Sequence, residues 1–336
     1  MSIARDLDTP PDEVLDAARG GDRAAFDALI GPHLRVLHLH SYRMLGSYND
    51  AQDAVQETML HAWQGLSGFE GRAPLLHWLY RVSTTTCLKM IERRERQPVT
   101  TPWEVAWLQP YPDALLDRIT DRDADPAAVV DRREDVALAF IAALQLLPAT
   151  QRAVLILREV LAFPARDVAE LLETSVAGVN SALQRARATL AHAHAHADGP
   201  EAATRLPGER EREVLEAFLR AWHACDIPAL AALLRDDVVL SMPPQAIRIV
   251  GRDQVAGFFA TVPADGRLDL IRLVVTRANG HPALAAYLPD EGTPGSSHGY
   301  GIMVLTLSGD RIATITGFTD PDLFPIFGLP ASSRSV

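Results

Sequence analysis

Residues 147–190 read LPATQRAVLILREVLAFPARDVAELLETSVAGVNSALQRARATL, which is the pattern of two short helices followed by a longer one. Apolar residues recur three and four positions apart, so each predicted helix has one buried stripe. Pro164 opens the second helix, because proline at the first helical position loses no hydrogen bond. The corner at Glu173, Thr174 and Ser175 supplies a polar turn and an N-cap for the last helix. This layout predicts a helix-turn-helix.

The polar face of the last predicted helix suits a reader of DNA. Small and amide side chains come first and can reach base edges, whereas the arginines that follow can hold phosphates. The predicted DNA contacts are Ser175, Ala177, Asn180, Ser181, Gln184, Arg185 and Arg187. Periodicity alone leaves one alternative open, which is an ordinary helical hairpin with a solvated polar face.

A second motif precedes the helix-turn-helix. Residues 26–96 form a helical block that ends in a basic cluster, with the segments YRMLG at 42–46, DAQDAVQE at 50–57 and WLYR at 78–81. These segments, with Ala62-Trp63 and Cys87-Leu88, resemble region 2 of the extracytoplasmic-function sigma factors, small members of the bacterial sigma family. The helix-turn-helix resembles region 4 of the same family. Two motifs in the family's order are more specific than either motif alone.

The resemblance implies a surface for core RNA polymerase. In this family, the helix that carries the acidic motif docks on a coiled coil of the largest polymerase subunit. The residues that the resemblance assigns to this contact are Asp50, Asp53, Gln56 and Glu57, which avoid the apolar positions of their helix. An acidic patch suits an arginine-rich partner. A plain solvated helix face has the same composition and stays as the alternative.

The resemblance also implies a surface for the −10 promoter element. Promoter melting needs a pocket for a flipped base and positive charge for the displaced strand. The residues assigned to this task are Trp78, Arg81, Thr84, Thr85, Lys89, Arg93 and Arg94. Gln52 and the threonines at 84–86 depart from the commonest pattern of the family, so the promoter sequence stays open.

The composition indicates that the chain depends on a partner for tight DNA binding. The formal net charge is −11, and the acids concentrate in residues 97–135 and 198–336. We expect weak affinity for free DNA, because counterion release scales with the phosphates that a protein neutralises. Cys87 and Cys225 lie far apart, which supports neither a disulfide framework nor a zinc site. We expect core RNA polymerase and promoter DNA as partners, a cytoplasmic location, no membrane contact, no metal and no cofactor.

The sequence divides into four predicted parts. They are sigma region 2 at 12–96, a linker at 97–133, the region 4 helix-turn-helix at 134–196 and a C-terminal domain at 205–325. The linker is rich in proline and acid. In the family it threads past the polymerase active centre, where its acids could mimic RNA phosphates; a disordered tether explains the same composition.

The C-terminal domain is predicted to belong to a different structural class from the helical regions before it. Two amphipathic helices from residue 211 precede short apolar runs, which predict strands at 238–242, 246–250, 270–275, 283–288, 300–307 and 312–318. The strand at 241–244, the helix start at 251–253 and the turn at 279–283 resemble the SnoaL-like domains that extend one sigma subgroup. The predicted fold is therefore multidomain, with two all-α sigma domains joined by a linker and followed by a cone-shaped α+β SnoaL-like domain.

Such a cone has a mouth that can bind a small molecule, and this fold hosts both enzymes and binding modules. The candidate pocket residues are Trp222, Met242, Tyr287, His298 and Tyr300, although the same side chains could simply fill the cone. We predict a sigma factor, not an enzyme, that reads −10 and −35 elements and is regulated in cis by its C-terminal domain. The alternatives are a one-component DNA-binding regulator with a small-molecule pocket, and a SnoaL-like enzyme with a targeting domain.

Overall fold

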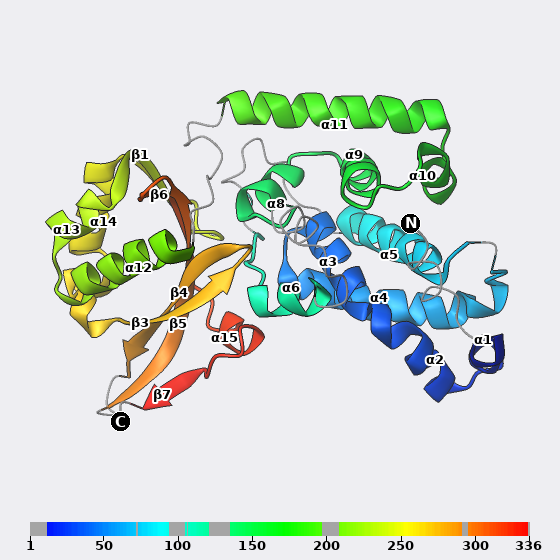
Figure 1. Cartoon of the computed structure of the whole chain (residues 1–336), viewed down its shortest axis with the longest axis horizontal. Coiled ribbons are helices and arrows are strands. Elements are labelled where there is room, and N and C mark those ends of the chain that lie inside the picture. The colour runs from blue at the N-terminus through cyan, green and yellow to red at the C-terminus, as the bar shows by residue number, and fades with distance from the viewer. Residues whose placement is uncertain are drawn as a thin grey trace. The chain divides into compact units, whose positions relative to one another are not determined.

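The computed structural model describes residues 12–71, 73–93, 105, 107–120, 135–196, 208–290 and 295–334, and Figure 1 gives the labels of their elements. Contacts between residues divide the chain into two compact units. The first unit is Met1–Thr100 with Ala139–Ala195, and the second is Thr101–Leu138 with His196–Val336. Predicted region 2 and all but the ends of predicted region 4 therefore fall in the first unit. The predicted linker groups with the C-terminal domain.

The described part of the first unit is built from helices. Region 2 contains α1 (Asp12–Arg19), α2 (Arg23–Ile30), α3 (Leu34–Leu45), α4 (Tyr48–Gly65) and α5 (Leu75–Arg93). Region 4 contains α8 (Leu138–Leu144), α9 (Ala149–Leu155), α10 (Ala165–Leu171) and α11 (Val176–His196). Among all described residues, no helix has the length and apolar composition to cross a membrane.

Local signals set the limits of the region 2 helices. The Asp22 side chain caps α2 by accepting hydrogen bonds from the backbone of Ala24 and Ala25. Gly46 ends α3 in the left-handed conformation, with φ of 74°. Ser47 then caps α4 through a 3.2 Å hydrogen bond from the Asp50 amide. The chain therefore reverses direction between α3 and α4 with its terminal polar groups satisfied.

The core of region 2 encloses ionisable side chains. α3 packs against both α4 and α5. His40 is fully buried in this core, and its Nε2 lies 2.9 Å from the Thr84 hydroxyl on α5. Burial lowers the pKa of His38 to about 4, and burial with the nearby Arg43 charge lowers the pKa of His40 to about 3, from 6.5. Both imidazoles are therefore neutral at neutral pH.

The second unit is built on a mixed sheet. The strands are β1 (Leu234–Ser241), β2 (Arg248–Val250), β3 (Arg272–Ala278), β4 (His281–Pro289), β5 (Ser296–Ser308), β6 (Arg311–Phe318) and β7 (Ser332–Arg334). Their order is β2-β1-β6-β5-β4-β3, with β7 paired to β5. β1 and β6 are parallel, and the other neighbours are antiparallel. All six strands predicted from the sequence are present, and β7 is the one that the sequence analysis missed.

Helices cover one face of this sheet. α12 (Gly208–His223), α13 (Ile227–Ala232) and α14 (Arg252–Thr261) lie against it in Figure 1. Phe218, Trp222 and Phe259 form an aromatic core there, with Leu284 and Leu305 from the sheet. Alternation along a strand places neighbouring residues on opposite faces. The short helix α15 (Leu323–Ile326) packs on the other face, where Phe324 meets Tyr287 at 4.9 Å between ring centroids.

Acid should destabilise the first unit through its buried histidines. Below pH 6.5 the unfolded chain binds protons that folded His38 and His40 exclude, so the free energy of unfolding falls until their folded-state pKa values are reached. At about pH 5 we expect a loss of about 2 kcal/mol for each histidine. Hydrogen exchange of the α3 and α5 amides, corrected for its intrinsic pH dependence, measures this loss. His40→Gln should weaken the pH dependence, whereas the exposed control His223→Gln should leave it intact; equal pH profiles would contradict the assignment.

Candidate nucleic-acid and polymerase interfaces

The seven residues predicted to read the −35 element are all exposed along α11 or at its start. Ser175 caps the helix, with its hydroxyl accepting a 3.0 Å hydrogen bond from the Gly178 amide. Arg187 already has a partner, because its Nε donates to Glu159 at 2.6 Å. Val176, in the first turn of the helix, is also exposed, although it is apolar.

The predicted −10 residues on α5 lie on two different faces of that helix. Trp78, Thr85, Lys89 and Arg93 recur at helical spacing and share one face, on which Thr85, Lys89 and Arg93 are exposed. Thr84 is fully buried because its hydroxyl pairs with His40, so the structure corrects its prediction as a DNA contact. The surroundings of Arg81 and Trp78 differ from those of Thr84.

Arg81 borders the exposed face, and its guanidinium lies 3.6 Å from the Glu173 carboxylate at the start of the helix-turn-helix corner. Trp78 is half-buried and packs against Phe69, with 5.3 Å between ring centroids. Arg94 lies outside the described residues. Half-buried Trp78 and the exposed Thr85, Lys89 and Arg93 therefore share one side of α5.

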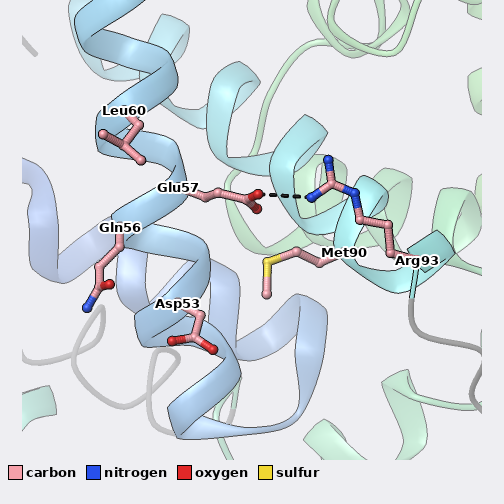
Figure 2. A pocket seen from close by; sticks show the side chains of 6 residues that line it. All are labelled: Asp53, Gln56, Glu57, Leu60, Met90 and Arg93. Atoms are coloured by element: carbon pink, nitrogen blue, oxygen red, sulfur yellow. Dashed lines mark hydrogen bonds and ion pairs between the residues drawn. The ribbon is translucent and has the colours of Figure 1, made fainter.

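A hollow of about 410 Å³ lies between α4 and the end of α5 (Figure 2). Its lining residues are Asp53, Gln56, Glu57, Leu60, Met90 and Arg93. Three of these six come from the predicted polymerase contact. Glu57 and Arg93 face each other across the hollow, with 3.0 Å between the carboxylate and the guanidinium (Figure 2). Arg93 was predicted as a DNA contact, but it lines this hollow together with the predicted polymerase contacts of α4. Asp50, the fourth predicted polymerase contact, lies one turn before Asp53 and does not line the hollow.

The apolar part of this surface was not among the residues predicted from the sequence. Leu60 is 62% exposed and Trp63 is 39% exposed, three residues further along α4. Exposed apolar groups beside acids are typical of protein interfaces, where an apolar centre is rimmed by charge. The signal was present in the sequence, because Leu60 falls out of phase with the apolar stripe of Ala51, Val55, Met59 and Ala62.

The structure does not assemble the predicted pocket of the C-terminal domain. Trp222 is buried in the core, and its indole donates a 3.2 Å hydrogen bond to the Ile271 carbonyl. Met242 also packs against this core. Tyr287 lies on the opposite face, where its hydroxyl donates to the Pro330 carbonyl, and Tyr300 is exposed. The structure therefore does not bring the five predicted residues into one pocket, because Trp222 and Met242 pack in the core while Tyr287 and Tyr300 lie outside it.

A separate hollow in the C-terminal domain includes one predicted residue, His298. It measures about 550 Å³ and is lined by Ala264, Leu270, Leu288, Pro289 and His298. His298 pairs with Asp290 at 2.6 Å. Hydrogen bonds from Ser296 and His298 lower the pKa of Asp290. The hollow is mainly apolar, with one imidazole and carboxylate pair at its edge.

Part of the predicted linker is folded onto the C-terminal domain. Asn279 and Gly280 form the tight turn between β3 and β4, with φ of 56° and 77°, as two-residue hairpins require. Asn279 is nevertheless fully buried, because residues of the linker cover it. Its Oδ1 accepts from the Tyr111 amide at 2.7 Å, its own amide donates to the Tyr111 carbonyl at 2.9 Å, and its Nδ2 donates to the Val136 carbonyl at 2.6 Å.

An ion pair completes this attachment, which we call the linker clasp (Tyr111, Asp113, Val136, Arg277 and Asn279). Asp113 is almost fully buried at the start of α6 (Asp113–Thr120). Its carboxylate accepts from the Gly280 amide at 2.8 Å and from Arg277 at 3.3 Å. Arg277 also pairs with Glu211 of α12. These residues of the 97–133 segment are thus not a disordered tether.

Among the residues that the structure describes, no three histidine, cysteine or acidic side chains gather as metal ligands. Cys87 is buried, and burial raises the pKa of its thiol to about 12. This thiol is therefore protonated and poorly suited to bind a metal.

Comparisons with known families match all three folded parts. Residues 29–97 match "Sigma-70 region 2", and residues 137–190 match "Sigma-70, region 4". Residues 215–315 match "SnoaL-like domain". The crystal structure of the extracytoplasmic function sigma factor SigJ of Mycobacterium tuberculosis aligns with a TM-score of 0.60 at 23% identity, and it covers 88% of this chain and 98% of that chain. The two chains therefore share a fold.

Relatives extend the match along most of the sequence. ECF RNA polymerase sigma factor SigG of Mycobacterium tuberculosis is 39% identical over 330 residues, which cover 92% of this chain and 85% of SigG. ECF RNA polymerase sigma factor SigJ of the same organism is 29% identical, and the match covers 88% of this chain and 92% of SigJ. The chain therefore belongs to the ECF RNA polymerase sigma factors.

Proposed function

We propose that this sigma factor binds core RNA polymerase through the hollow between α4 and α5. The observation that carries the proposal is the exposed Leu60 beside Asp53 and Glu57. Leu60 supplies apolar area that would be removed from water, and the carboxylates complement a basic partner. The Glu57–Arg93 pair is mostly solvent-accessible, so exchanging Arg93 for a partner's arginine costs little.

Promoter reading is divided between the two helical regions in this proposal. The exposed face of α11 reads the −35 element, with Asn180 at base edges and Arg185 on phosphate. The face of α5 with Trp78, Thr85 and Lys89 holds the −10 element, where an aromatic and a cation suit an unstacked strand. Binding of the protein to the promoter supplies the free energy for melting the DNA duplex.

The C-terminal domain regulates the chain in cis through the linker clasp. Support comes from Asn279 and Asp113, which are buried together although they are far apart in sequence. The linker joins region 2 to region 4, so a domain that holds the linker limits how far the two regions can separate. A fused domain also acts at high effective concentration without a separate partner.

Substitution of the apolar centre should weaken polymerase binding. Leu60→Asp should raise the Kd for core polymerase at least about tenfold, since it removes apolar contact and adds a charge to desolvate. Val262→Asp is the matched control, because Val262 is similarly exposed but lies on α14's C-terminal side in the other unit. Equal Kd values for both variants, measured by fluorescence anisotropy, would refute this surface.

Alanine substitutions of the two kinds of DNA contact on α11 should have different effects on promoter binding. In the holoenzyme, Asn180→Ala should relax discrimination at one −35 base pair by about 1–3 kcal/mol. Arg185→Ala should weaken binding to all promoter sequences alike and lower the salt slope by about 1. Titrations with a set of single-base promoter variants at several salt concentrations separate these results. If Asn180→Ala changed all sequences equally, base reading by Asn180 would be excluded.

Removal of the C-terminal domain should change initiation. Run-off transcription on a genomic fragment library, with core polymerase, should give discrete start sites with the full chain and an altered yield after truncation at Asp198. Arg277→Ala should shift the yield in the same direction, because it removes the partner of buried Asp113. Arg311→Ala, an exposed arginine on the same sheet, is the control. Equal yields from full-length and truncated chains at equal abundance would refute regulation in cis.

A further inference from the structure

Asn279 stands in a sequence context that makes its side chain chemically labile. The chain has three asparagines, and only Asn279 is followed by glycine. In an Asn-Gly pair, the backbone nitrogen of the glycine can attack the asparagine Cγ, because glycine has no side chain to block the approach. Asn-Gly suits a two-residue hairpin, but Asp-Gly also serves such a turn. The turn alone therefore does not explain why an amide side chain occupies position 279.

The linker clasp uses both ends of the Asn279 side chain. Its Oδ1 accepts from the Tyr111 amide at 2.7 Å, and its Nδ2 donates to the Val136 carbonyl at 2.6 Å. An aspartate could make the first of these bonds, but a carboxylate has no hydrogen to donate to the Val136 carbonyl. It would also add a second charge to a clasp that already buries Asp113. The closed clasp therefore requires asparagine rather than aspartate.

The same contacts oppose attack on the side chain while the clasp is closed. The Gly280 nitrogen, which would be the nucleophile, donates its hydrogen to the Asp113 carboxylate at 2.8 Å. The Asn279 side chain is held at both ends, so rotation of its Cγ toward that nitrogen would break two hydrogen bonds. Asn279 is also fully buried and shielded from water. The reaction therefore has to wait until the linker leaves the turn.

We propose that Asn279 is a deamidation site that the linker clasp protects, and that deamidation makes release of the linker irreversible. Once the linker leaves, the Gly280 nitrogen bonds to the Asn279 Cγ and the bond from Cγ to Nδ2 breaks. Ammonia departs with the proton that the Gly280 nitrogen gives up through water. A second water molecule then adds to one of the two carbonyls of the resulting succinimide ring and breaks its bond to nitrogen. The product is aspartate or isoaspartate, and the step needs no oxidant or reductant.

Neither product can rebuild the clasp. Aspartate lacks the hydrogen-bond donor for the Val136 carbonyl. Isoaspartate routes the main chain through the former side chain, so an additional methylene displaces the backbone of a turn whose Asn279 amide donates to the Tyr111 carbonyl at 2.9 Å. The proposal rests on the proposed regulation in cis for its biological meaning. A chain whose linker has once been released for long enough stays released.

The rate of deamidation at Asn279 tests the protective role of the clasp. Peptide mass spectrometry of the full-length chain, incubated at neutral pH, should show slow deamidation in the original sequence. Asp113→Ala should raise the rate at least about tenfold, toward the rate in chemical denaturant, because local opening of the clasp becomes easier. Asp117→Ala, at an exposed position of the same helix, is the matched control and should leave the rate unchanged.

The effect of the product on the clasp is tested with Asn279→Asp, which reproduces one of the two products. Hydrogen exchange at the Tyr111 and Gly280 amides should become at least about tenfold faster in this variant. Gln245→Glu adds the same charge at an exposed position of the same domain and should leave this exchange unchanged. Protection of the α12 amides around Phe218 shows that each variant is folded.

Two results would overturn the proposal. One is an equal deamidation rate at Asn279 in the original chain and in folded Asp113→Ala. The other is an Asn279→Asp chain whose Tyr111 amide stays as protected as in the original sequence. Neither readout needs polymerase. Core polymerase should accelerate deamidation of the original chain; a missing acceleration, with that of Asp113→Ala intact, would refute the withdrawal of the linker by polymerase and not the modification.

Discussion

Buried Asn279 joins three stretches of backbone, and the path of the chain through the second unit depends on it. A buried backbone amide or carbonyl must find a hydrogen-bond partner. The Asn279 side chain supplies one for the Tyr111 amide and another for the Val136 carbonyl, and its backbone supplies a third for Tyr111. A hairpin turn is ordinarily exposed. Here the turn is a docking point for Tyr111 of the linker and for Val136 just after the linker.

The linker clasp has a counterpart in the first unit, where a polar side chain also bonds to backbone that is distant in sequence. Asp113 accepts from the Gly280 amide, and Arg152 donates to the Met44 carbonyl. A typical hydrogen bond contributes a net of about 1 kcal/mol, because water competes for the same groups. Such contacts are weak enough to yield when a partner buries a larger apolar surface, as proposed for core polymerase at Leu60.

The sequence predicted those parts of the fold that depend on local pattern. The helix-turn-helix and six strands of the C-terminal sheet follow from apolar periodicity, and the turn at Asn279 follows from its Asn-Gly pair. Periodicity cannot show which face of α5 meets a neighbour, so Thr84 was assigned to DNA although it bonds to His40. The ion pair of Asp113 with Arg277 was also beyond reach, because its members are 164 residues apart and each is an ordinary surface residue by composition. The predicted pocket was not found for the same reason, since the residue types of Trp222 and Tyr287 do not reveal which face of the sheet each side chain occupies.

Asp113 connects the acidic charge of the linker with the proposed regulation of this sigma factor. The acids of this segment suit two tasks, mimicry of RNA inside polymerase and attachment to the C-terminal domain. One carboxylate cannot do both at once: in the clasp, Asp113 accepts hydrogen bonds from Gly280 and Arg277 and is removed from solvent. Withdrawing it leaves Arg277 with Glu211 and the Gly280 carbonyl, so the loss of one buried partner opposes release. In the proposed mechanism, polymerase and the C-terminal domain therefore compete for the same residues of the linker, and the strength of the clasp sets how readily this sigma factor is used.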